Sequence, residues 1–140
     1  MNNIFENKGF LINGIQHLSG SEAIQCIEQG AVLVDIREFY DISYKVFDVE
    51  NVLNIPKSEL EKNLSLIPKD KPVIIADAFG INSKPIVLKL KESGFENIAN
   101  LIGGILEWEK DGFPVKKDFK GELNGPCMCM LKTKGKLSNK

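Results

Sequence analysis

The chain has 140 residues, of which 43% are hydrophobic and 26% charged, and its formal net charge is −1. This length fits one domain that can bury a core without disulfides or metals. The near-zero charge provides no global attraction to nucleic acid. No apolar stretch approaches the ~18 residues of a membrane span, and the first ten residues lack the features of a signal peptide. Three cysteines, an odd number, suit a reducing compartment. We therefore expect a cytoplasmic protein that binds neither nucleic acid nor a membrane.

The charge is unevenly distributed. Residues 1–115 are acidic overall, whereas residues 116–140 contain seven lysines against Asp118 and Glu122. From about Lys116 the hydrophobic pattern gives way to polar residues, glycine and lysine, which is typical of a tail.

The first half of the chain predicts one helix and two strands. Ser19 and Glu22 form a capping-box pattern for a helix that Gly30 ends. The apolar run 31–36 is typical of a parallel strand buried on both faces. Residues 37–47 are interpreted as a short helix or a loop. A short strand is expected over 52–56, followed by a helical turn capped by Ser58.

The second half alternates strands and helices. Residues 72–76 form a second buried strand pattern, and the segment from Ser83 to Gly94 predicts a helix. A strand over 96–101 and a short helix in 103–112 follow. This alternation indicates an α/β domain with a mainly parallel sheet.

The stretch 77–83 follows a buried strand and precedes a helix. Ligands in open α/β sheets bind outside the carboxyl ends of strands, and N–H groups at a helix start attract anions. We therefore interpret this stretch as a binding loop. Its residues are Asp77, Ala78, Phe79, Gly80, Ile81, Asn82 and Ser83.

Four stretches of the chain carry recognisable motifs: VLVDIRE (32–38), NIPKSEL (54–60), IPKDKPVII (67–75) and residues 89–115. Together they resemble the rhodanese-like domain family. The first two stretches are similar to its first and second signatures. The third resembles the lead-in to its active-site loop, and the fourth resembles the C-terminal half of the domain. The resemblance implies a five-stranded parallel sheet flanked by helices on both faces. It divides the chain into an N-terminal extension (1–16), the domain (17–115) and a basic, Cys/Met-containing tail (116–140).

The resemblance also implies sulfane-sulfur transfer through a persulfide on the first loop residue, a cysteine in active members. That position is Asp77 here, and Ala78 and Asn82 stand where small active members often carry arginine. A persulfide needs a polarisable thiolate. Because a carboxylate can neither attack a sulfur donor nor carry the sulfur, direct sulfur transfer at Asp77 is excluded.

Three roles remain for Asp77. In the structural role, its oxygens accept N–H bonds from the loop that follows, in place of a thiolate or a bound anion. An acid/base or metal role lacks a histidine or second carboxylate obviously paired with it. A nucleophilic role in phosphoryl transfer lacks the usual supporting acidic motif and lysine. We favour the structural role.

Other polar and aromatic residues are given structural roles. The resemblance implies an ion pair between Asp35 and Arg37 that fixes the loops. His17 is expected at the surface or in a capping position, and Trp108 in the core or at its rim. Cys26 is interpreted as a small buried hydrophobe.

The tail contains Cys127 and Cys129, each followed by a methionine. Soft thiolates and thioethers suit Cu(I) or zinc, and paired thiols suit redox exchange or a persulfide relay. Two ligands are too few for a closed zinc site. The cysteines can equally be incidental features of a tail.

We therefore hypothesise a rhodanese-like domain without its own persulfide cysteine, which acts as a binding or regulatory module. The expected partner is an unidentified protein or a small anionic ligand, and no cofactor or metal is expected. The alternative is a sulfurtransferase or thiol-redox protein that uses Cys127 and Cys129.

Overall fold

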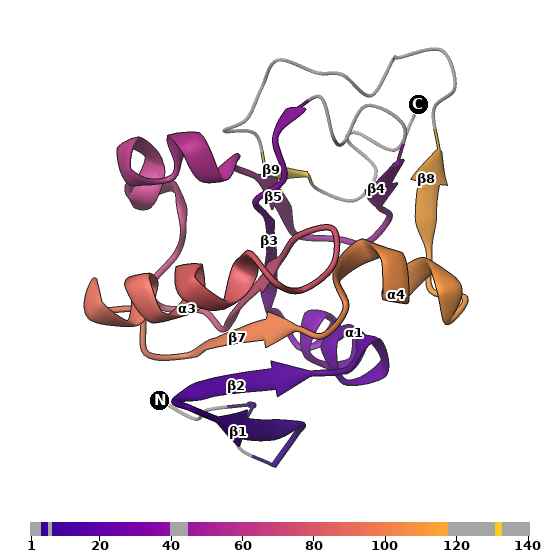
Figure 1. Ribbon diagram of the computed structural model, residues 1–140, viewed down its shortest axis with the longest axis horizontal. Helices are drawn as coiled ribbons and strands as arrows, with labels where there is room; N and C mark the ends of the chain where they lie inside the picture. Colours follow the sequence, from indigo (N-terminus) through magenta and orange to yellow (C-terminus); the bar gives the residue numbers. More distant parts are fainter. Residues whose placement is uncertain (1–3, 6, 40–44, 118–130, 133–140) are drawn as a thin grey trace.

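A computed structural model describes residues 4–5, 7–39, 45–117 and 131–132 (Figure 1). The strands of its main sheet are β1 (Phe10–Ile12), β2 (Ile15–Leu18), β3 (Val32–Asp35), β5 (Val52–Asn54), β6 (Val73–Ala76), β7 (Ile98–Leu101) and β9 (Leu131–Lys132). They follow the order β1-β2-β7-β6-β3-β5-β9. A separate antiparallel pair consists of β4 (Lys45–Phe47) and β8 (Val115–Lys117).

The five central strands of the main sheet are parallel, as the sequence predicts, and β1 and β9 add antiparallel edges. Asp35 at the end of β3 lies opposite Ala76 of β6 and Asn54 of β5. The carboxyl ends of these strands therefore meet at one edge of the sheet, where the loop after β6 begins.

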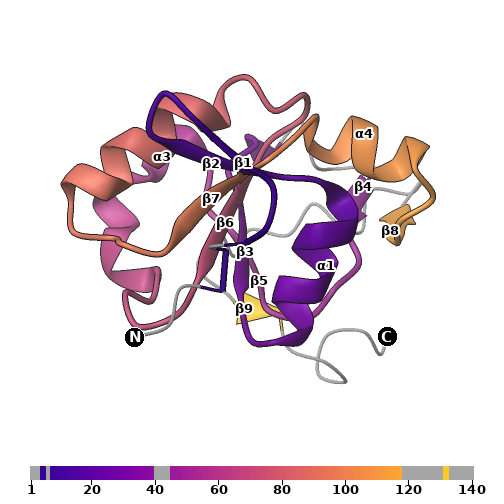
Figure 2. The ribbon, with the colours of Figure 1, turned by 90° about the horizontal axis from the view of Figure 1, so that it is seen from below.

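Helices cover both faces of the sheet (Figure 2). They are α1 (Gly20–Glu28), α3 (Ser83–Glu92), α4 (Gly104–Lys110) and the 3₁₀ helices η1 (Lys57–Glu59) and η2 (Glu61–Leu66). The predicted capping box of α1 is present, because Ser19 Oγ accepts from Glu22 N while Glu22 accepts from Ser19 N.

Successive side chains along a strand point to opposite faces of the sheet, so each central strand contributes to two separate hydrophobic cores. Leu33 and Ile74 pack in the core that contains residues of α1 and α4. Val34 and Ile75 pack in the core that contains residues of α3. All four side chains are fully buried, and each such burial contributes roughly 1.5–3 kcal/mol. The sheet is thus fixed between two apolar layers.

The N-terminal segment takes part in the main sheet. β1 and β2 form a hairpin with Phe10 opposite His17, and β2 pairs with β7. Ile15 and Gln16, which were placed in the N-terminal extension, therefore belong to a strand of the sheet.

Two local expectations were wrong. The segment 37–47, expected to be a short helix or a loop, ends in strand β4, because Phe47 pairs with Val115 of β8. Ser58 does not cap a helix from its N-cap position. Pro56 occupies the N-cap of η1, and the Ser58 hydroxyl donates instead to Glu38 Oε1 at 2.9 Å.

Candidate functional site

Asp77 is the first residue after β6 and is buried, with 4% of its surface exposed. Its Oδ1 accepts a hydrogen bond from the Gly80 backbone N–H, and its Oδ2 accepts one from the Asn82 N–H at 2.7 Å. These are the carboxylate–amide bonds that the structural interpretation of Asp77 expects. The Asp77 carboxylate thus accepts hydrogen bonds from two backbone N–H groups that could otherwise bind an anion in the loop.

The start of α4 holds the other side of the loop. Ile105 N donates to Asp77 O at 2.9 Å, and Leu106 N donates to Ala78 O at 3.1 Å. A Cβ atom on Gly104 would lie 2.4 Å from Asp77 O, so the two segments approach closely only because residue 104 is glycine. No pattern in the sequence indicates this close approach, because the two segments are 27 residues apart in the chain.

Asp35 and Arg37 form the ion pair that the family resemblance implies. The guanidinium donates to both carboxylate oxygens, at 3.0 Å from Nε to Oδ1 and 2.8 Å from Nη2 to Oδ2. Arg37 Nη2 also donates to Lys45 O at 2.9 Å, and the guanidinium lies over the Phe47 ring. The pair is almost fully buried. Through its hydrogen bonds to Asp35 and to Lys45 O, Arg37 therefore connects the end of β3 with β4.

A chain of three buried polar side chains leads from β2 to the loop. The Ser83 hydroxyl donates to Asn100 Oδ1, and Asn100 Nδ2 lies 3.1 Å from His17 Nδ1. With Nδ1 as acceptor, the imidazole is neutral. The pKa of His17 is lowered first by burial and then by the charge of Lys84. The expectation of a surface or capping role for His17 is therefore wrong, because 7% of the residue is exposed.

Asn100 and Ser83 were not assigned this role from the sequence. Asn100 is 1% exposed within the apolar strand β7, and Ser83 is fully buried at the start of α3. A polar residue within a buried strand needs a hydrogen-bond partner. In the sequence, a polar residue at position 100 within an apolar strand pattern was the feature that could have indicated a buried hydrogen-bond partner.

A small cavity opens beside Asp77. It encloses about 250 Å³, and it is lined by Ile36, Arg37, Glu38, Lys57, Asp77, Ala78 and Asn82. Arg37 already bonds Asp35, and Glu38 accepts from the N–H and hydroxyl of Ser58. These bonds orient two of the charged groups at the cavity mouth toward other parts of the protein.

The outer side of the loop is apolar. Phe79 and Ile81 have 59% and 65% of their surface exposed, and Leu106 on α4 has 53%. The hydrogen bond from Leu106 N to Ala78 O holds α4 next to this part of the loop. We call the three residues Phe79, Ile81 and Leu106 the loop patch.

The remaining candidate residues lie apart from this site. Cys26 is fully buried on α1, and burial raises the pKa of its thiol, in accord with its role as a small hydrophobe. Trp108 is buried, and its Nε1 donates to Pro114 O at 2.8 Å. Cys127 and Cys129 lie outside the described residues.

The described part of the chain contains neither a membrane-spanning helix nor a cluster of metal-binding side chains. No helix there is long and apolar enough to cross a membrane. Among the same residues, no group of three or more His, Cys, Asp or Glu side chains is arranged to hold a metal ion.

Comparison with known proteins places this chain in a family. The model of the rhodanese-like domain matches residues 19–111. A sulfurtransferase of Allochromatium vinosum is 30% identical over 105 residues, which cover 75% of this chain and 95% of that protein. The thiosulfate sulfurtransferase GlpE of Haemophilus influenzae is 26% identical over 100 residues, which cover 71% and 93%.

The solved structures give the same result. A rhodanese-related protein of Thermoplasma volcanium has a TM-score of 0.66 and 27% identity, over 73% of this chain and 98% of that one. The chain belongs to the rhodanese-like domain family.

Proposed function

We propose that this rhodanese-like domain is a non-catalytic binding module and that residues 77–83 are its binding face. One observation carries the proposal: the Asp77 carboxylate accepts the N–H groups of Gly80 and Asn82. A thiolate in this position could attack a sulfur donor and hold a persulfide, whereas a carboxylate cannot. The relatives' names describe sulfur transfer, and in this chain Asp77 stands at the position that the family resemblance assigns to the persulfide cysteine.

The same hydrogen bonds bear on the kind of ligand. An anion that entered the loop would have to displace the carboxylate from its N–H donors or approach it as a like charge. This argument disfavours the small anionic ligand considered from the sequence. The loop patch offers three exposed apolar side chains instead. Exposed hydrophobic groups rimmed by polar residues are typical of protein interaction sites, so we favour a protein partner.

The alternative function is sulfur handling by Cys127 and Cys129. The position of β9 favours this alternative. Leu131 lies opposite Leu53 in an antiparallel pair, and β5 ends at Asn54. Leu131, the first residue of β9, therefore lies toward the carboxyl-end edge of the sheet, where the 77–83 loop also begins.

A thiosulfate sulfurtransferase assay on three proteins tests both functions: the wild type, Asp77→Asn, and the double variant Cys127→Ser, Cys129→Ser. For a binding module, we expect no turnover above the uncatalysed rate in any of them. Turnover that is lost in Asp77→Asn but kept in the double variant would contradict the proposal. Turnover that is lost only in the double variant would establish the tail thiols as the sulfur carriers.

A further inference from the structure

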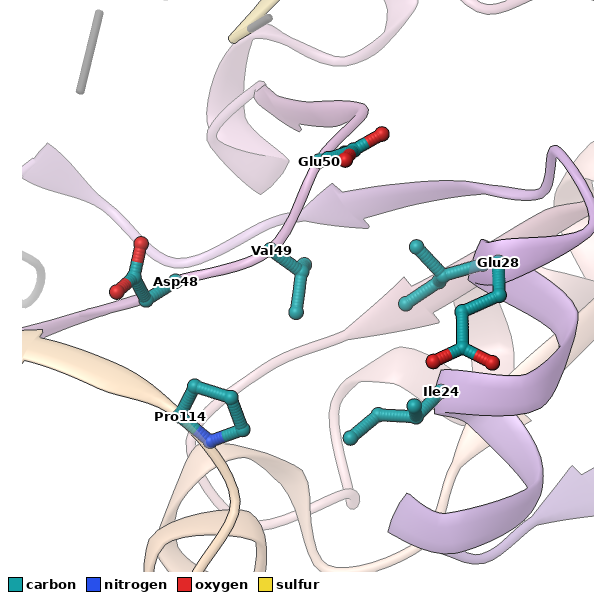
Figure 3. A pocket seen from close by; sticks show the side chains of 7 residues that line it. Ile24, Glu28, Asp48, Val49, Glu50 and Pro114 are labelled. Atoms are coloured by element: carbon teal, nitrogen blue, oxygen red, sulfur yellow. The ribbon is translucent and has the colours of Figure 1, made fainter. Parts of the chain in front are cut away.

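A second cavity lies between α1 and the segment that joins β4 to β5, close to the start of β5 rather than to the 77–83 loop. It encloses about 390 Å³. Figure 3 shows Ile24 and Glu28 on α1, with Val49 and Glu50 on the segment that faces the helix. Ile24, Val49 and Pro114 give the cavity an apolar floor, and its carboxylates are Glu28, Asp48 and Glu50. We call this cavity the acidic cavity.

Strand β9 leads toward the acidic cavity. Val52 lies opposite Lys132 and Leu53 opposite Leu131 in the antiparallel pair. Because the strands are antiparallel, the chain beyond Lys132 leaves β9 in the direction of Asn51 and the residues before it. Those residues, Asp48–Glu50, line the cavity.

We infer that the C-terminal segment 133–140 binds in the acidic cavity of the same chain. Lys134 and Lys136 follow Lys132 by two and four residues, and Glu50 and Asp48 precede its partner Val52 by two and four. At about 3.3 Å per residue, these positions lie roughly 7 and 13 Å beyond Lys132, within reach of the cavity. The inference concerns a surface separate from the binding face and does not depend on the proposed function.

Charge and shape both support this occupant. The segment 133–140 (TKGKLSNK) contains three lysines and no acidic residue, and it carries a single large apolar residue, Leu137. Lysine side chains lay their methylene groups along apolar surface while the ammonium group stays near water or a carboxylate. The floor of Ile24, Val49 and Pro114 suits the methylene groups and Leu137, and the carboxylates suit the ammonium groups.

Limited digestion of the full-length protein with trypsin tests the inference, because trypsin cleaves after lysine. The variant Glu28→Gln, Glu50→Gln removes two cavity carboxylates, and the matched control Glu92→Gln, Glu96→Gln removes two exposed carboxylates elsewhere. We expect cleavage after Lys134 and Lys136 to be about fivefold faster in the cavity variant than in the wild type, and unchanged in the control. Equal cleavage rates in all three proteins would overturn the inference.

Zero-length carbodiimide cross-linking provides a second readout that does not depend on protease access. In the monomer fraction, we expect amide bonds from Lys134 or Lys136 to Glu28, Asp48 or Glu50, which peptide mass spectrometry identifies. The yield of the cross-link to Asp48 should fall in the variant Glu28→Gln, Glu50→Gln relative to the control Glu92→Gln, Glu96→Gln. Cross-links from these lysines that are spread over unrelated carboxylates, or that occur only in cross-linked dimers, would contradict binding within one chain.

Discussion

The backbone N–H of Asn82 donates a hydrogen bond of 2.7 Å to Oδ2 of Asp77, and the N–H of Gly80 donates to Oδ1 of the same carboxylate. The first residue of the loop therefore binds the loop's own amides. This relationship makes the loop depend on an acceptor at position 77.

Asp77→Ala should lower the free energy of unfolding by about 1–3 kcal/mol, because it leaves loop N–H donors in a largely buried site without their acceptor. Denaturant unfolding at neutral pH measures the change. Asp70→Ala removes an exposed aspartate and serves as the control, for which we expect a change within about 0.5 kcal/mol. Equal midpoints for Asp77→Ala and the wild type would show that the two hydrogen bonds contribute nothing to stability.

Asp77→Cys should place a thiol among the same amide donors at the start of α3. Because N–H groups and the helix dipole favour a thiolate, we expect the pKa of this thiol to lie below the ordinary ~8.5. The rate of alkylation against pH measures it, in a background of Cys127→Ser and Cys129→Ser. Asp77→Ser in the same background is the control, since buried Cys26 has a raised pKa and should react slowly.

Sulfur transfer by the Asp77→Cys variant should remain weak, because Ala78 and Asn82 supply no charge for an anionic donor. Adding Ala78→Arg and Asn82→Arg should raise cyanide-trapped sulfane sulfur. An introduced thiol that titrates like a free cysteine and forms no persulfide would show that the loop does not stabilise an anion.

Gly104→Ala should destabilise the protein more than Gly112→Ala does. Both glycines have positive φ, 62° and 86°. A Cβ on residue 104 would lie 2.4 Å from Asp77 O, whereas one on residue 112 would have no heavy atom within 4 Å. We expect a cost of about 1–2 kcal/mol for the backbone strain at either position and about 1–3 kcal/mol more for the clash at 104. Thermal or denaturant unfolding measures both, and similar costs would contradict the close approach.

His17 should make stability depend on pH below neutrality. Burial and then the charge of Lys84 lower its pKa, so the folded state favours the neutral imidazole. The stability that this provides is present above the unfolded pKa of ~6.5 and is lost as the pH falls through the folded value. Unfolding free energies measured between pH 7.5 and 5 should therefore decline more steeply for the wild type than for His17→Gln.

The histidine measurement is simple to interpret because His17 is the only histidine in the chain. Carboxylates titrate mostly below this window. Parallel pH profiles for the two proteins would mean that protonation of His17 is not coupled to folding.

Local patterns in the sequence predicted the central elements of the fold. The apolar runs at Val32–Asp35 and Val73–Ala76 became fully buried parallel strands, because a strand covered on both faces needs apolar side chains on both. Ser19 and Glu22 predicted the start of α1, because both partners of a capping box lie within one turn. In each case the residues that decide the structure are close together in the chain.

Tertiary structure alone decided the environments of His17 and Gly104. His17 is buried because β2 pairs with β7, whose residue Asn100 is 83 positions away in the sequence. Gly104 is required because α4 packs against Asp77 and Ala78 at the end of another strand. Strand pairing and close backbone approach depend on main-chain atoms, which every residue carries, so side-chain patterns contain little information about which distant segments will meet.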